Sequence, residues 1–128
     1  AIVMREGPDV SIVACGLMGS AALEAAEALE AEGISAEVVN MHTIKPLDTE
    51  TLFASAAKTG RVVTVEEHSV IGGLGEAVCA ALCEHTPVRV KRVGVQDVYG
   101  ESGPALDLLD KYGLNAEGIA FAVREVLA

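Results

Sequence analysis

The sequence predicts an α/β fold in which a mainly parallel β-sheet lies between two layers of helices. Short runs rich in Val and Ile alternate along the chain with longer runs rich in Ala and Leu, as strands alternate with helices in such folds. Hydrophobic residues make up 51% of the chain and aromatic residues only 3%, so we expect helices to approach the sheet closely through Ala and Gly. We predict a single domain spanning residues 1–128.

Two kinds of strand are predicted. Val10–Cys15 and Arg61–Glu66 are nearly continuous apolar runs, which is typical of central parallel strands that are buried on both faces. Val88–Val93 instead carries Arg89 and Lys91 at alternate positions, and charges placed in this way protect an exposed edge strand from unwanted pairing. The other predicted strands are Ile2–Met4 and Glu37–His42.

Helices are predicted from polar N-caps, glycine stops and apolar residues at helical spacing. Those with an N-cap are Ala21–Glu32 with Ser20, Thr49–Lys58 with Asp48, and Ala116–Leu127 with Asn115. Gly33 and Gly60 are expected to end the first two. A further helix should follow the glycine-rich segment and reach Glu84, and a short one should begin at Pro104.

The charge balance argues against two classes of partner. The 9 basic and 19 acidic residues give a formal net charge of −10 and a pI near 4.6. Nucleic acid is disfavoured because phosphate binding needs clustered Lys and Arg, and an anionic membrane surface is disfavoured for the same reason. The longest apolar runs are far shorter than the roughly 18 residues of a membrane span.

The three cysteines, Cys15, Cys79 and Cys83, are odd in number and lie in apolar surroundings. We therefore expect buried, reduced thiols in a cytoplasmic protein rather than a disulfide framework. The first residues, AIVMREG, lack the basic and then apolar pattern of a leader. They begin as a section cut from a longer chain would begin.

The segment VTVEEHSVIGGLGEAV, residues 63–78, is the main candidate site. Glu66, Glu67 and His68 come at the carboxyl end of a parallel strand, where open α/β sheets usually bind ligands. A paired acid and histidine can transfer protons, and Gly72-Gly73-Leu74-Gly75 before a helix can hold an anion on free N–H groups. The structural alternative is that the glycines only allow a sharp turn from strand to helix, and we favour this interpretation.

Another glycine turn, residues 14–19, also follows a strand and opens a helix, as the dinucleotide fingerprint Gly-x-Gly-x-x-Gly does. Its first position is Ala14, and the next strand ends in Asn40-Met41-His42, without an acid for a ribose hydroxyl. A structural turn is therefore the better interpretation.

Two further clusters of polar or sulfur-containing side chains are candidate sites. Cys79, Cys83 and His85, with His68 as the one candidate for a fourth ligand, have a spacing from which a zinc site can be drawn. Packing of small apolar residues is the better account of them. The loop after the last strand is rich in functional groups, and binding and helix capping are equally good explanations for it. These groups belong to Asp97, Tyr99, Glu101 and Ser102.

Three stretches together resemble the C-terminal domain of transketolase-type thiamine-diphosphate enzymes. They are Ile44-Lys45-Pro46-Leu47-Asp48, VEEHSVIGGLGEAV and VGVQDVYGESGPALDLLDKYGLNAEGIAFAV. The similarity covers nearly the whole chain. It is greatest to transketolases encoded as separate N- and C-terminal sections, then to deoxyxylulose-phosphate synthase, and weaker to the beta subunits of 2-oxo-acid dehydrogenases.

This resemblance implies a three-layer α/β/α sandwich on a five-stranded mixed sheet, in the order 1-3-2-4-5 with the first strand antiparallel. It also implies that the full enzyme transfers two-carbon ketol units between sugar phosphates with thiamine diphosphate and Mg²⁺, and that it is a homodimer. The cofactor would lie between an N-terminal diphosphate-binding domain and a pyrimidine-binding domain, each preceding this one.

For this domain the resemblance implies assembly rather than chemistry. No Gly-Asp-Gly for Mg²⁺ occurs in the sequence, so we expect no catalytic, cofactor-binding or metal-binding residue in it. The residues expected at an interface or a ligand edge are Glu67, His68, Gly72, Gly73, Asp97 and Ser102. A free-standing nucleotide- or anion-binding module, or an interaction module for another protein, remains the alternative.

Overall fold

The computed structural model describes residues 1–16, 18–42, 44, 46–69, 73–95 and 114–128. At its centre is a five-stranded sheet in the order β1-β3-β2-β4-β5. β1 (Ile2–Arg5) is antiparallel to β3 (Ala36–Asn40), whereas the pairs β3 with β2 (Val10–Ala14), β2 with β4 (Arg61–Ser69) and β4 with β5 (Arg89–Val95) are parallel. The predicted strand order and the antiparallel first strand are confirmed.

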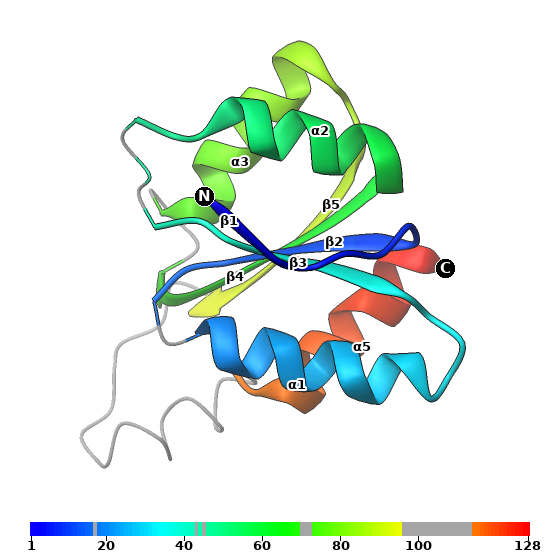
Figure 1. The fold of residues 1–128 in the computed structure, drawn as a ribbon. Coiled ribbons are helices and arrows are strands. Elements are labelled where there is room, and N and C mark those ends of the chain that lie inside the picture. Colours follow the sequence, from blue (N-terminus) through cyan, green and yellow to red (C-terminus); the bar gives the residue numbers. More distant parts are fainter. Residues whose placement is uncertain (17, 43, 45, 70–72, 96–113) are drawn as a thin grey trace, which may run out of the picture.

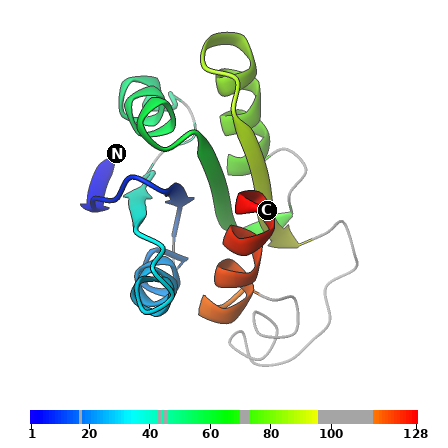
Figure 2. The same cartoon turned by 90° about the vertical axis from the view of Figure 1, so that its right-hand side faces the viewer.

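Among the residues that the structure describes, helices cover both faces of this sheet (Figures 1 and 2). α1 (Met18–Glu30) and α5 (Ala116–Leu127) form one layer, and α2 (Thr49–Thr59) and α3 (Leu74–His85) form the other. A hydrophobic cluster fills the space between sheet and helices on each side. Across the residues that the structure describes, no helix combines the length and apolar character needed to cross a membrane.

The helices approach the sheet closely, as the shortage of aromatic residues predicts. β2 is buried along its whole length, with Ile12 in the α1/α5 cluster and Val13 in the α2/α3 cluster. Gly75 in the first turn of α3 lies so near the sheet that a Cβ there would be 2.9 Å from Arg92 Cδ and 3.0 Å from Thr64 Oγ1. A side chain at this position would therefore force Arg92 or Thr64 to shift.

Local capping signals explain most of the element boundaries. The carboxylate of Asp48 accepts a hydrogen bond from Thr51 N–H, and the amide oxygen of Asn115 accepts one from Gly118 N–H, so both predicted N-caps are confirmed. Gly33, with φ +83°, closes α1 because its own N–H bonds to Glu30 O.

Several predicted boundaries are wrong. Ser20 does not cap α1, because Met18 N–H already bonds to Cys15 O and the helix begins two residues before Ser20. β3 covers Ala36–Asn40 rather than Glu37–His42, and β4 continues to Ser69 because it keeps pairing with β5. The short helix expected at Pro104 lies outside the described residues.

β5 forms one edge of the sheet, as its charge pattern predicts. Arg89 and Lys91 are exposed, whereas Val88 and Val90 are half-buried and contact the α2/α3 cluster. Arg89 Nη1 donates to Ala128 O at 2.6 Å, and Lys91 Nζ lies 3.6 Å from Glu125 Oε1, so both cations reach towards the end of α5.

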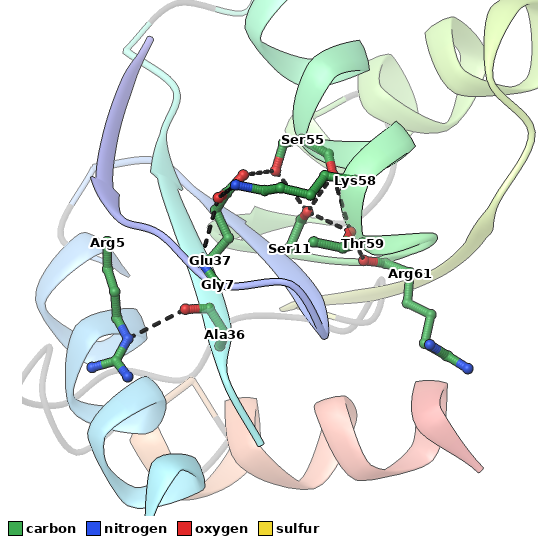
Figure 3. Close-up of polar contacts among 9 residues, drawn as sticks. All are labelled: Arg5, Gly7, Ser11, Ala36, Glu37, Ser55, Lys58, Thr59 and Arg61. Atoms are coloured by element: carbon green, nitrogen blue, oxygen red, sulfur yellow. Dashed lines mark hydrogen bonds and ion pairs between the residues drawn. The ribbon is translucent and has the colours of Figure 1, made fainter. Parts of the chain in front are cut away.

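A buried polar network fastens α2 to the sheet (Figure 3). Ser11 Oγ in β2 lies 2.6 Å from Ser55 Oγ and 2.7 Å from Thr59 Oγ1. Ser55 Oγ in turn donates to Glu37 Oε2 of β3 at 2.6 Å. Because buried polar groups are costly when unpaired, this chain of bonds fixes where α2 lies on β2 and β3.

Glu37 is the charged member of that network and is only 2% exposed. Its carboxylate accepts from Gly7 N–H at 3.4 Å and forms an ion pair with Lys58 of α2. Burial alone would raise the pKa of Glu37, but the hydrogen bonds from Lys58, Ser55 and Gly7 outweigh it and hold the pKa below its ordinary value. The charged carboxylate thus joins the β1–β2 connection to α2.

Two buried threonines provide a matched test of hydrogen bonding. Thr64 Oγ1 is buried and has no hydrogen-bond partner in the part of the chain that the structure describes, whereas Thr59 Oγ1 lies 3.1 Å from Ser55 O and 3.0 Å from Arg61 O. We predict that Thr64→Val raises the free energy of unfolding by up to about 1 kcal/mol and that Thr59→Val lowers it by about 1 to 3 kcal/mol. Urea unfolding checks both, and equal effects of the same sign would contradict the prediction.

The cap of α2 predicts a loss of stability in acid. Hydrogen bonds, above all that from Thr51 N–H and with it that from Thr51 Oγ1, lower the pKa of Asp48 from 3.8 to about 2. Because the unfolded chain takes up this proton first, the contribution of Asp48 to stability is complete above pH 3.8 and disappears as the pH falls to about 2. In Asp48→Asn, which keeps a capping oxygen, unfolding followed by circular dichroism should lack this step. A step that persists in the variant would contradict the assignment.

Candidate functional site

The candidate site lies at the carboxyl edge of the sheet, between its two neighbouring strands β2 and β4. From β2 the chain enters α1 on one face, and from β4 it enters α3 on the opposite face. In open α/β sheets, ligands bind in the crevice where successive connections diverge in this way. The predicted segment around Glu66 to Gly73 therefore begins at the edge where a site is expected.

Glu66 ends the buried part of β4 and caps α3. Its Oε1 accepts from Leu74 N–H at 2.8 Å and its Oε2 from Gly75 N–H at 2.7 Å, and the residue is fully buried. The negative carboxylate also lies at the positive end of the helix dipole. Glu66 is therefore a structural anchor that joins strand to helix across the glycine-rich turn.

This contact changes the interpretation of the glycine-rich turn. Gly73 is the N-cap residue of α3 and has extended backbone. The N–H groups of Leu74 and Gly75, which an anion would need, already donate to Glu66. At these two groups the chain supplies its own carboxylate in place of a bound phosphate.

Glu67 of β4 lies beside Gly16, which follows β2. Its Oε1 lies 2.6 Å from the position that a Cβ on Gly16 would take. Gly16 also has φ +62°, a conformation that residues with side chains rarely adopt. The backbone angle therefore favours glycine here, and a side chain at this position would also displace the Glu67 carboxylate, which is half-buried.

Cys15 is a member of this edge that the sequence analysis did not place in it. Burial raises the pKa of its thiol, and the nearby carboxylates of Glu66 and Glu67 raise it further. A thiol with a raised pKa stays protonated near neutral pH and is a poor nucleophile or metal ligand. Burial first, and the two carboxylates second, thus keep Cys15 unreactive.

The remaining predicted edge residues are only partly described. His68 lies within β4, which carries it to the same edge as Glu67, but its side chain is outside the described atoms. Gly72, Asp97 and Ser102 lie outside the described residues. Of the six predicted interface or ligand-edge residues, Glu67 and Gly73 are therefore the two whose surroundings can be stated.

The zinc alternative finds no support in the described part of the chain. Within it, no three His, Cys, Asp or Glu side chains come together as metal ligands. His85 instead stacks on the ring of Phe53, with the centroids 3.9 Å apart. The cysteines are free, as expected, but Cys83 is exposed and Cys15 and Cys79 are half-buried. The prediction of buried thiols is therefore wrong for Cys83, which lies on the solvent side of α3.

These features define a class of domain: a three-layer α/β/α unit on a mixed sheet, with acidic side chains organising its carboxyl edge. The chain belongs to the family of transketolase C-terminal domains, whose family model matches residues 1–119.

Relatives of this family match nearly all of the chain. A 6-deoxy-6-sulfo-D-fructose transketolase subunit, SqwH, of Clostridium sp. (strain MSTE9) is 52% identical over 98% of the chain and 39% of its own length. A 1-deoxy-D-xylulose-5-phosphate synthase of Heliobacterium modesticaldum is 46% identical over 97% of the chain and 19% of its own length. The chain thus spans less than half the length of each.

A solved structure agrees with this assignment. The structure described as a split gene transketolase, inactive beta4 tetramer, superposes with a TM-score of 0.94 at 56% sequence identity. The match covers 98% of this chain and 41% of that one. The fold observed here is therefore that of a part of a larger transketolase polypeptide.

The cap on α3 yields a specific prediction. In Glu66→Gln one oxygen becomes an NH₂ group that faces a backbone donor, so we expect the free energy of unfolding to fall by about 1 to 3 kcal/mol. Amide hydrogen exchange at Leu74 and Gly75 should accelerate more than elsewhere in α3. Glu84→Gln, at an exposed position of the same helix, serves as the control. Equal protection in both variants would contradict the role of Glu66.

Proposed function

We propose that the chain is the C-terminal, non-catalytic domain of a transketolase-like enzyme that transfers two-carbon ketol units between sugar phosphates. In this proposal residues 1–128 form one domain that supports the active-site domains and the association of subunits. The observation that carries it is the contact between Glu66 and α3, because the N–H groups that a free-standing anion-binding module would use are already bonded.

The family's cofactor does not fit the residues described here. Mg²⁺ with thiamine diphosphate needs oxygen ligands around the metal. The sequence has no Gly-Asp-Gly, and no ligand cluster is found among the described side chains. We therefore assign thiamine diphosphate and Mg²⁺ to the diphosphate- and pyrimidine-binding domains of the full enzyme. The cofactor supplies a carbanion-stabilising ring there, and this chain supplies rigid support.

Glu67, His68, Gly72 and Gly73 are proposed to face those neighbouring domains, and Asp97 and Ser102 are proposed to belong to the same contact. Glu67 supports this assignment because its carboxylate is held at the carboxyl edge near Gly16. We also propose that copies of the chain associate, since the solved relative with 56% identity is described as a tetramer of one subunit.

A second candidate is the C-terminal domain of deoxyxylulose-phosphate synthase, favoured by the 46% identity to such an enzyme. The complete native enzyme, purified through a tag on this chain, should be assayed with two substrate pairs. Ketose phosphate with aldose phosphate tests transketolase activity, and pyruvate with glyceraldehyde phosphate tests the synthase. Activity with only the second pair would replace the leading proposal.

The proposal predicts that the 128-residue chain alone is inactive. Titration calorimetry with thiamine diphosphate and MgCl₂ should give no binding heat, and ketose phosphates should not be consumed. Magnesium-dependent binding at about micromolar strength, close to −8 kcal/mol, would contradict it. Sugar phosphates or nucleotides could instead raise the melting temperature of the wild-type chain but not of Gly73→Val. That result would favour a free-standing binding module.

A further inference from the structure

Two cysteines lie in one row along α3. Gly75, Cys79 and Cys83 are four residues apart, so their positions follow one another along one side of the helix. Gly75 is buried beside Arg92 of β5, Cys79 is half-buried and Cys83 is exposed. The row therefore rises from the sheet into solvent, and its outer part carries two free thiols.

The packing of α3 fixes the spacing of this pair. Leu74, Val78 and Leu82 are buried in the cluster between the helix and the sheet, so the backbone that carries both cysteines is held along its length. Side chains four residues apart on a helix have Cβ atoms about 5–6 Å apart, whereas a disulfide needs about 3.5–4.5 Å. The pair therefore cannot close into a disulfide while α3 stays helical.

The other candidate metal ligands have different neighbours. The charged groups that act on Cys15 are Glu66 and Glu67, and the ring of His85 stacks on Phe53. Among the described side chains, no set of three His, Cys, Asp or Glu could hold a metal ion. The row on α3 therefore offers two sulfur ligands. A structural zinc ion, which takes four ligands in a closed tetrahedron, does not fit it.

We propose that Cys79 and Cys83 bind one soft monovalent cation, Cu(I), in line between their two sulfur atoms. Thiolates are the ligands that Cu(I) prefers, and this ion is stable with only two of them. An ion held in line separates the sulfur atoms by twice the bond length, about 4.6 Å for a metal–sulfur bond of about 2.3 Å. Helical spacing leaves a gap of about this size, which a direct sulfur–sulfur bond cannot span.

The charges around the pair are compatible with this ion. Burial above all raises the pKa of Cys79; Arg92 lowers this pKa, whereas Glu76 and Cys83 raise it. The influence of Cys83 agrees with two thiols lying close together. A coordinated thiol is deprotonated outright, so each sulfur exchanges its proton for a bond to Cu(I) and the protons pass to solvent. Two thiolates and one monovalent cation leave one net negative charge, which the nearby Arg92 guanidinium stabilises.

Competition with the chelator bicinchoninate, in ascorbate and without oxygen, tests the site on the purified chain. We expect one Cu(I) to bind per chain. Cys79→Ser and Cys83→Ser should each weaken binding at least about 100-fold, because the second bond of the wild-type site forms within one molecule. Cys15→Ser should bind Cu(I) as the wild type does, and circular dichroism should show that all three variants keep the fold.

A matched variant keeps the number of thiols on α3 but breaks their alignment. Cys79→Ser combined with Glu84→Cys places the thiols at positions 83 and 84, and adjacent helical residues do not face each other. This double variant should bind Cu(I) as weakly as Cys79→Ser alone. Affinity equal to that of the wild type, in the double variant or in either single serine variant of α3, would overturn the proposal.

X-ray absorption of the Cu(I)-loaded chain provides a second measurement. We expect two sulfur neighbours in a linear arrangement, and sedimentation velocity should show the same oligomeric state with and without the ion. Three sulfur neighbours, a change of oligomeric state on loading, or a wild-type chain that cannot compete with bicinchoninate would each overturn the site. These outcomes leave the proposed function standing, because that function fails separately, through turnover of sugar phosphates by the isolated chain.

Discussion

The carboxylate of Glu66 connects the central strands to the layer that covers them. It is fully buried at the end of β4 and holds the first two N–H groups of α3. Burying a charge without partners would be highly unfavourable, so the residue is compatible with the fold only when α3 begins at this point. The chain then enters β5 from the far end of α3, and the close contact of Gly75 with Arg92 of β5 follows from the same placement.

The two faces of the sheet are fixed by different kinds of interaction. The layer of α1 and α5 packs on apolar side chains such as Ile12, Val63 and Val65. The layer of α2 and α3 packs on apolar side chains too, but it is also fastened by polar groups that alternate with them, namely Ser11 and Glu66. Hydrogen bonds are directional whereas apolar packing is not, so the polar face determines where its helices lie along the strands.

Local signals in the sequence were sufficient to predict most helices and strands, but they were insufficient to predict how the candidate site is built. The caps at Asp48 and Asn115 and the charged edge at Arg89 and Lys91 depend on neighbouring residues, and the structure has them as predicted. The role of Glu66 depends on bonds to residues eight and nine positions away, which no periodic pattern indicates.

Other features that the sequence did not predict also have specific physical causes. Ser20 is a good capping residue by type, but the left-handed turn at Gly16 lets the helix start earlier. The direction of β1 followed from the family resemblance, because a run of four residues carries no signal for parallel or antiparallel pairing. The exposed position of Cys83 was missed because its helix also carries Cys79, and the sequence does not show which of the two faces the sheet.

The electrostatics of the carboxyl edge bear on what it can bind. Burial raises the pKa of Cys15 most, and the carboxylates of Glu66 and Glu67 raise it further, so two acidic side chains lie close together between β2 and β4. Sugar phosphates and nucleotides are anions, which the positive N-terminal end of α3 would attract. The carboxylate of Glu66 already occupies this end of the helix. The described part of this edge is therefore better suited to receive backbone donors or basic side chains of an adjoining protein surface than a phosphorylated substrate.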